Sequence, residues 1–320
     1  MKQRINYLDA AKGLCMLIIM CCHMGVDTHV PMSHTVQTTA FFMISGFFFS
    51  VKTDGRSLLL KSCKTILLPF AVFYVLSYIL FYAGSYLVSG FSEMTTANGL
   101  LDCFTQRQFF NGPLWFLLCL FWVRLIAWCV IRFIPKEWMQ VIVSLILGGG
   151  GHLLGSQEVF LPLCFDIALS SVPVFYVGYL IKKHAWLDKF DVIESGVLAT
   201  VFYISCLALP IVIENSLNYS SGNYPKTLYV SLCISIALIF FSKFGLSSSK
   251  VISYIGRNTM WLMCTHHLLY RPVKIAIGHF VTNDVVQSWI VFSITLIICC
   301  ATAPLVNKYM PIIVGKTKKQ

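Results

Sequence analysis

The chain has 320 residues, of which 57% are hydrophobic and only 12% are charged, and its mean hydropathy is +0.76. About a quarter of a typical soluble domain is charged, so this composition excludes a water-soluble protein and indicates one whose solvent is lipid. The formal net charge of +11 does not indicate a nucleic-acid partner, because the Lys and Arg residues lie in short connectors rather than in one basic stripe.

Ten apolar runs are each about long enough for a membrane-spanning helix, which needs about 20 residues. In chain order they cover residues 8–28, 36–52, 65–88, 113–134, 138–154, 159–181, 190–213, 225–243, 257–280 and 285–310. The fifth run is the least helix-like of them, because it contains four consecutive glycines at 148–151. We expect an all-α polytopic bundle of about ten transmembrane helices, with one domain at 1–315 and a short basic tail at 316–320.

The connectors between these runs differ in charge. With the N-terminus in the cytoplasm, almost all connector Lys and Arg residues fall in cytoplasmic segments, and the outer segments hold only Arg107, Lys226, Arg271 and Lys274. Because positive loops stay inside, the pattern predicts that both termini are cytoplasmic. Most of the 13 cysteines lie within apolar runs without metal-ligand spacing, so we expect neither a disulfide framework nor a metal site.

The first run carries ionisable residues, which are costly in lipid and usually face the protein interior. Lys12 and His23 are eleven positions apart, so on a helix they lie within about 20° of one face and about 16 Å apart along the axis. An acyl-coenzyme A donor has anionic phosphates for Lys12 and a long arm that would bring its tip to His23. His23 would then be the general base for an acceptor hydroxyl. Alternatively, Lys12 reaches the headgroups and His23 makes an interhelical hydrogen bond.

Three later positions carry similar groups. Asp166 in the sixth run and His266 in the ninth would reach the level of His23 if both side chains turn inward. Asp166 would then orient an imidazole, or else cap a helix or bond a neighbour. Lys61 and Lys64 precede the third run, where they would guide donor phosphates or anchor the helix in the headgroups.

Several short motifs resemble, in the right order, those of the acyltransferase 3 family of bacterial membrane proteins, which O-acylate sugars and related hydroxyl acceptors. The first-helix motif reads Leu8-Asp9-Ala10-Ala11-Lys12-Gly13 and continues to His23. The others are Phe41-Phe42-Met43-Ile44-Ser45-Gly46-Phe47, the pair Lys61 and Lys64 before Pro69, Trp115-Phe116, and Gly256-Arg257-Asn258-Thr259 through His266.

The resemblance implies a cytoplasmic acyl-coenzyme A donor, most often acetyl-coenzyme A, as a substrate rather than a bound cofactor. It implies catalysis by His23, with Asp166 and His266 as further candidates, and a donor site formed by Lys12, Lys61, Lys64 and Ser45. For the acceptor, a cell-surface or lipid-linked glycan, our candidates are Trp115, Asn111 and Arg107. The expected location is the inner or plasma membrane of a bacterium.

Two departures from the family and two other hypotheses remain open. Many members have Arg at the position of Lys12, and some sugar acetylases have His-Met-Pro where this chain has Gln37-Thr38-Thr39. A secondary transporter or glycan flippase is the main alternative, although no internal repeat of the kind common in transporters is visible. A family member that senses a ligand without turnover is another.

Overall fold

The computed structural model describes residues 5–29, 33–52, 54–89, 109–209 and 211–316. These residues form a helical protein with one two-stranded sheet. The helices are α1 (Asn6–His23), α2 (Ser33–Phe47), α3 (Gly55–Ser62), η1 (Cys63–Leu67), α4 (Leu68–Ser89), η3 (Gly112–Leu114), α6 (Trp115–Phe133), α7 (Glu137–Ser156), η4 (Pro162–Cys164), α8 (Phe165–Lys183), η5 (Trp186–Lys189), α9 (Val192–Leu207), η6 (Asn215–Leu217), α10 (Tyr224–Gly245), α11 (Lys250–Arg257), α12 (Thr259–Gly278), α13 (Asp284–Tyr309) and η7 (Pro311–Val314). The strands are β1 (Ile213–Glu214) and β2 (Tyr219–Ser220).

A helix lies on every one of the ten predicted runs. By length and composition, six helical segments of the described chain are able to cross a membrane, namely Gly55–Gly84, Gly112–Phe133, Glu137–Ser156, Pro162–Lys183, Tyr224–Gly245 and Asp284–Tyr309. Two further apolar helices, Thr38–Phe47 and Val192–Leu207, are shorter. The chain is therefore a polytopic helical membrane protein, and the number of ten crossings stays a prediction.

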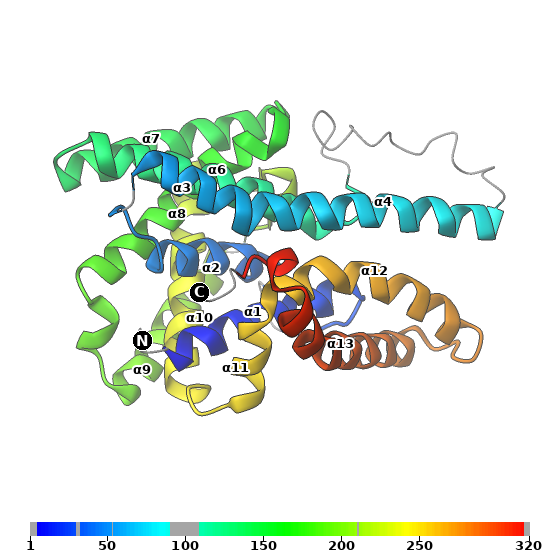
Figure 1. The fold of residues 1–320 in the computed structure, drawn as a ribbon. Helices are drawn as coiled ribbons and strands as arrows, with labels where there is room; N and C mark the ends of the chain where they lie inside the picture. Colours follow the sequence, from blue (N-terminus) through cyan, green and yellow to red (C-terminus); the bar gives the residue numbers. More distant parts are fainter. Residues whose placement is uncertain (1–4, 30–32, 53, 90–108, 210, 317–320) are drawn as a thin grey trace.

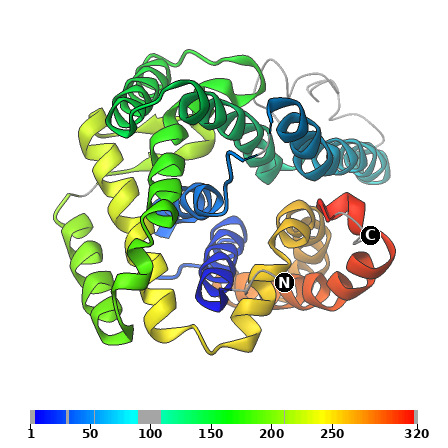
Figure 2. The ribbon, with the colours of Figure 1, turned by 60° about the vertical axis from the view of Figure 1, so that its left-hand side comes forward.

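The bundle is built around α1 and α2. Figure 2 shows these two helices in the middle with the other helices around them, and α1 contacts α2, α10, α11 and α12. Both central helices bury apolar side chains such as Leu8, Met16, Phe42 and Met43. The motif residues of the first helix are thus surrounded by protein instead of lipid.

Two close crossings hold these central helices, and each depends on a pair of glycines. Where α2 crosses α8, a Cβ on Gly46 would overlap the Phe175 carbonyl and one on Gly178 would overlap the Met43 carbonyl. Where α1 crosses α11, Gly13 lies against the Ile252 carbonyl and Gly256 against that of Asp9. Small residues of this kind let the backbones of membrane helices approach closely.

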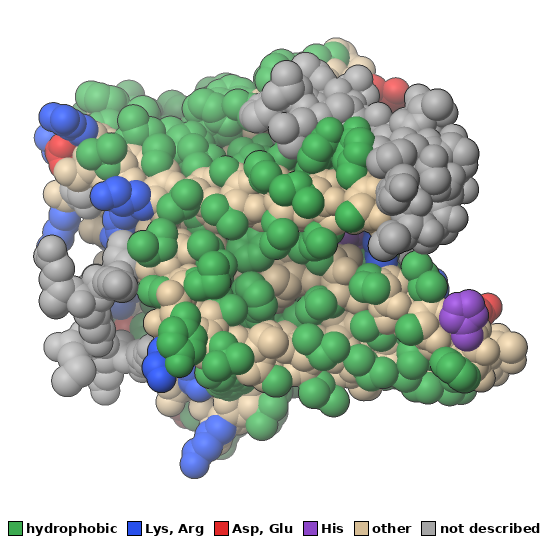
Figure 3. Space-filling view, turned by 45° about the vertical axis from the view of Figure 1, so that its right-hand side comes forward, with side chains coloured by type: hydrophobic (Ala, Val, Ile, Leu, Met, Phe, Trp, Pro, Cys, Tyr) green, Lys and Arg blue, Asp and Glu red, His purple; other side chains and the backbone are tan. Residues whose placement is uncertain are grey.

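The outer surface is predominantly apolar. Figure 3 shows hydrophobic side chains over the broad middle of the molecule and most of the visible Lys and Arg toward the left-hand end. Outward-facing residues such as Ile79 on α4, Ile146 on α7, Val201 on α9 and Ile297 on α13 are more than half exposed. A surface of this kind suits a hydrocarbon solvent, with the charged end outside it.

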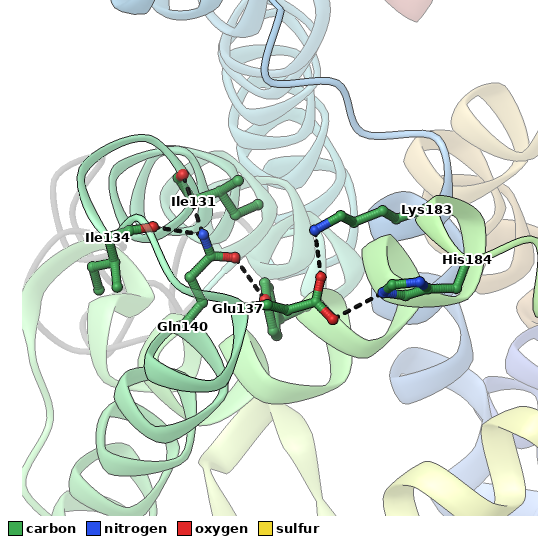
Figure 4. Close-up of polar contacts among 7 residues, drawn as sticks. Ile131, Ile134, Glu137, Gln140, Lys183 and His184 are labelled. Carbon is green, nitrogen blue, oxygen red and sulfur yellow. Dashed lines mark hydrogen bonds and ion pairs between the residues drawn. The ribbon is translucent and has the colours of Figure 1, made fainter.

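A polar network joins α6, α7 and α8 at one end of the bundle (Figure 4). Glu137 pairs with Lys183 and with the His184 Nε2 atom, the latter at 2.8 Å. Gln140 donates to the Ile134 carbonyl at 2.7 Å and accepts from the Tyr176 hydroxyl at 2.7 Å. Together these bonds hold the end of α6 to α7 and α8.

The structure differs from the sequence prediction in three places. The helix on the third predicted run begins ten residues before the predicted start at residue 65, because α3, the π-helical turn η1 and α4 follow each other without a break from Gly55. The ninth run is preceded by α11, a separate helix that ends at Arg257. The glycine run at 148–151 does not interrupt α7, because Gly148 and Gly151 face Pro173 and Ser170 of α8, where no larger residue fits.

Candidate functional site

His23 is the last residue of α1, and its side chain is exposed. The chain turns away directly after it, at Gly25 with a φ of +73°, a conformation that glycine adopts without strain. The imidazole opens on a cavity of about 270 Å³ whose wall comes from α1, α2, α6, α12 and the segment after α9. The lining residues are Ile19, Cys22, His23, Thr38, Phe41, Pro113, Trp115, Phe116, Glu214, Asn215, Ser216 and Met263.

Two more imidazoles flank His23. The ring centroids of His23 and His266 are 5.4 Å apart, and those of His23 and His267 are 5.6 Å apart. The His266 side chain is fully buried, and its Nδ1 atom lies 2.7 Å from the Leu262 carbonyl. A carbonyl only accepts hydrogen bonds, so Nδ1 of neutral His266 carries the proton and Nε2 has the free lone pair. That Nε2 atom and His267 Nδ1 have no hydrogen-bond partner among the described residues.

The segment before α6 supplies the neighbours of these imidazoles. Asn111 is fully buried and donates from Nδ2 to the Cys264 carbonyl at 2.7 Å, which ties this segment to α12. A Cβ on Gly112 would lie 3.9 Å from His267 Nε2. Trp115 begins α6 and is buried in the wall of the cavity that contains His23. The candidates His23, His266, Asn111 and Trp115 therefore come together, whereas Arg107 lies outside the described residues.

Asp166 is fully buried at the start of α8, where it binds a loop. Its Oδ1 atom accepts from the Leu161 N–H at 3.2 Å and its Oδ2 atom from Asn218 Nδ2 at 3.0 Å. These two partners belong to the connector before α8 and to the segment between β1 and β2. In the structure Asp166 thus bonds a neighbour, which is the alternative that the sequence left open, and its role beside an imidazole stays a prediction.

Lys12 lies on α1 about 16 Å along the axis from His23, as the spacing of eleven residues requires. Its ammonium group forms an ion pair with Asp9 Oδ1 at 2.6 Å, and both side chains are largely buried. The Phe48 ring, just after the end of α2, lies 5.7 Å from the Lys12 nitrogen. The partly buried Ser45 is three residues before Phe48, so this end of α2 faces the Lys12 level of α1.

Lys61 and Lys64 are exposed on α3 and η1. The C-terminal turn η7 packs against η1 and α4, with Gly315 directly against the Thr65 carbonyl. From there a chain of hydrogen bonds leads back toward α1. Lys316 binds Asn307 at 2.6 Å, and Asn307 binds Asn258 at 2.7 Å, one residue beyond the helix that packs on Asp9.

The two ends of α1 thus carry groups with different chemical properties. One end of α1 carries a paired cation suited to an anionic ligand, and the other carries an imidazole that faces an accessible cavity. His267, Glu214 and Ser216 also belong to this site, and our sequence-based candidates did not include them. His267 follows His266 directly, and Glu214 and Ser216 lie in the polar connector before the eighth run. These residue types are visible in the sequence, but the sequence does not show that their side chains lie beside His23 or line its cavity.

These features define a polytopic membrane protein with an imidazole centre suited to proton transfer. A family model described as an acyltransferase domain matches residues 5–304. The chain therefore belongs to the acyltransferase 3 family and is a membrane acyltransferase, as the motifs indicated. No curated protein and no solved structure matches the chain.

Proposed function

We propose that the protein transfers an acyl group, in the simplest case acetyl, from cytoplasmic acyl-coenzyme A to a hydroxyl group of a cell-surface or lipid-linked glycan. The observation that carries this proposal is the position of His23, whose exposed ring faces a cavity of about 270 Å³ and lies 5.4 Å from the buried His266 ring. A cavity with a few convergent polar groups among apolar ones is typical of a small-molecule site.

The reaction that this arrangement supports is direct. A ring nitrogen of neutral His23 takes the proton of the acceptor hydroxyl, and the oxygen attacks the thioester carbonyl carbon. The carbon–sulfur bond then breaks, and the imidazolium returns the proton to the leaving thiolate. The products are an O-acyl ester and free coenzyme A, so His23 ends in its original state.

His266 supports this step through its tautomer. Its Nδ1–H is bound to the Leu262 carbonyl, so the lone pair of its Nε2 atom is available as an acceptor beside His23. A fixed acceptor next to a general base favours one orientation of the base and stabilises the imidazolium that forms during transfer. We assign His266 as a positioning residue.

The donor enters from the end of α1 that carries Lys12, with Lys61 and Lys64 as further cations for its phosphates. The distance of about 16 Å between the levels of Lys12 and His23 is within the reach of an extended pantetheine arm. This requires the charged end of the bundle to be cytoplasmic, with both termini there, and the membrane to be the inner or plasma membrane of a bacterium.

Acyl transfer in isolated membranes tests the proposal. Membranes with the wild-type protein should move the label of acetyl-labelled coenzyme A onto glycan, and His23→Ala should abolish this transfer. The matched control is His279→Ala, because His279 is an exposed histidine just after α12 and its loss should leave transfer unchanged. Full transfer by His23→Ala protein present at wild-type level would refute the role of His23.

A further inference from the structure

We propose that the hairpin β1–η6–β2 is the acceptor-recognition element, and that the Glu214 carboxylate binds a hydroxyl of a polyhydroxylated acceptor such as a neutral sugar. This inference rests on the proposed function for the identity of the cavity as an acceptor site. It assigns acceptor specificity to a segment that lies outside all the motifs described above.

The cavity around His23 has two unlike walls. One wall is aromatic and comes from Phe41 of α2 and from Trp115 and Phe116 of α6. The other is polar and comes from consecutive hairpin residues, Glu214, Asn215 and Ser216. A sugar has the same two kinds of surface, because its C–H face is apolar and its edges carry hydroxyl groups. An aromatic side chain beside placed polar groups is therefore suited to it.

Glu214 is held in a defined orientation. Ser216 donates from its hydroxyl to Glu214 Oε1 at 2.6 Å, which directs the carboxylate group and leaves Oε2 for a ligand. An ionised carboxylate has only acceptor sites, so it selects groups that donate, and hydroxyl groups are such donors. The same negative charge disfavours acidic sugars, so the site should prefer neutral acceptors to anionic ones.

The hairpin is held by contacts with the helices as well as by the pairing of its two strands. Its two strands pair Ile213 with Ser220 and Glu214 with Tyr219, and the Ile213 side chain is buried. Two paired residues per strand are too few to be stable alone, so the hairpin needs tertiary contacts. Asn215 lies between two cavities, because it lines both the His23 cavity and a second cavity of about 50 Å³ beside α7, α8 and α10.

Asn218 provides the main anchor. Its backbone is left-handed, with a φ of +55°, a conformation that Asn tolerates better than most residues. Its side chain donates to the Gly151 carbonyl at 2.9 Å and to Asp166 Oδ2 at 3.0 Å, and accepts from the Ser170 hydroxyl at 2.7 Å. Asp166 is therefore a positioning residue of the acceptor wall, reached through Asn218.

Saturation-transfer NMR on the protein in lipid nanodiscs tests this proposal with methyl β-glucoside, a neutral sugar probe. Wild-type protein should bind the probe. Glu214→Ala should lower the affinity about tenfold, the loss expected for one hydrogen bond to a charged group. Glu158→Ala is the matched control, since Glu158 is an exposed acid in the α7–α8 connector, and it should bind normally.

The outcomes separate this inference from the proposed function. Equal binding by Glu214→Ala and wild type, or no binding by wild type, would overturn the acceptor-recognition element. Binding that depends on Glu214 without any transfer of label from acetyl-coenzyme A would support the element and refute the acyl-transfer proposal. Glu214→Gln checks that the variant is folded, because it keeps the shape and one acceptor oxygen and should recover part of the lost affinity.

Discussion

The side chains of His23, His266 and His267 meet because the end of α1 lies beside the middle of α12. His23 is the last residue of α1, and the pair on α12 lies beside it with ring separations of 5.4 and 5.6 Å. Adjacent residues on a helix point about 100° apart, so His266 and His267 contact His23 from different sides. The hydrogen bond from His266 Nδ1 to the Leu262 carbonyl fixes the tautomer of His266.

At the other end of α1, the ion pair between Lys12 and Asp9 determines which variants can test the binding of the acyl donor. Replacing Lys12 alone leaves a largely buried Asp9 carboxylate without its partner, which is strongly destabilising. The double variant Asp9→Asn/Lys12→Gln removes both charges and should fold. We expect its KM for acetyl-coenzyme A to rise about tenfold, through loss of one charge-assisted hydrogen bond to phosphate, with little change in kcat.

Steady-state kinetics in membranes measures this effect. Lys52→Gln is the control, since Lys52 is an exposed lysine between α2 and α3 and its replacement should leave the KM unchanged. A double variant with the wild-type KM would remove Lys12 from the donor site.

The sequence could predict the spacing on α1 because a helix has fixed rise and rotation. The partners of each group across the bundle could not be predicted in the same way. Asp166 has Asn218 as a partner, and Asn218 lies in a hairpin with only two paired residues per strand. Such short strands have too few residues for an alternating pattern.

At the scale of helices, the crossing of α2 and α8 carries the second prediction. Gly178→Ala places a methyl group on the Met43 carbonyl, so the helices must separate and the protein should lose several degrees of thermal stability. Gly150→Ala is the matched control, because nothing lies within 4 Å of a Cβ there and alanine favours helix by about 1 kcal/mol over glycine.

Thermal denaturation of the detergent-solubilised variants distinguishes the two glycines. We expect a lower midpoint for Gly178→Ala and an unchanged or slightly higher one for Gly150→Ala. Equal midpoints would show that the crossing is looser than described.

The hairpin gives the third prediction. Asn218→Gly keeps a residue that adopts positive φ freely but removes three side-chain hydrogen bonds to α7 and α8. Amides of the hairpin, including the Ser221 N–H bound to the Val212 carbonyl at 3.0 Å, should exchange with solvent faster, while the exchange of α1 and α12 stays the same. Hydrogen–deuterium exchange with mass spectrometry measures both regions at once. Unchanged protection of the hairpin would mean that Asn218 does not anchor it.

The positions of the helices could be predicted from the lengths of the apolar runs, but the residues at which the helices begin and end could not. The break between α11 and α12 falls at Asn258, whose side chain binds the Tyr254 carbonyl and Asn307, and the contact with Asn307 depends on tertiary structure. The helix α7 continues through its four glycines because α8 packs against Gly148 and Gly151. Helix propensity alone disfavours this segment.

At the scale of the whole molecule, the charge asymmetry predicts which end faces the cytoplasm. In the predicted orientation the hairpin is outside, so alkaline phosphatase fused after Asn218 should be active, and the same enzyme fused after Lys189 should be inactive. Phosphatase activity of the two fusions in intact bacteria measures this directly. Active enzyme at both sites, or activity at Lys189 alone, would contradict the proposed orientation of the donor and acceptor ends.

The central claim is that one donor molecule spans α1 from the Lys12 level to His23. An electron cryomicroscopy structure of the wild-type protein in nanodiscs with a non-hydrolysable ketone analogue of acetyl-coenzyme A tests it most directly. We predict the phosphates beside Lys12, Lys61 or Lys64 and the carbonyl carbon in the His23 cavity, within reach of the His23 ring. An analogue bound with its carbonyl away from that cavity would contradict the account.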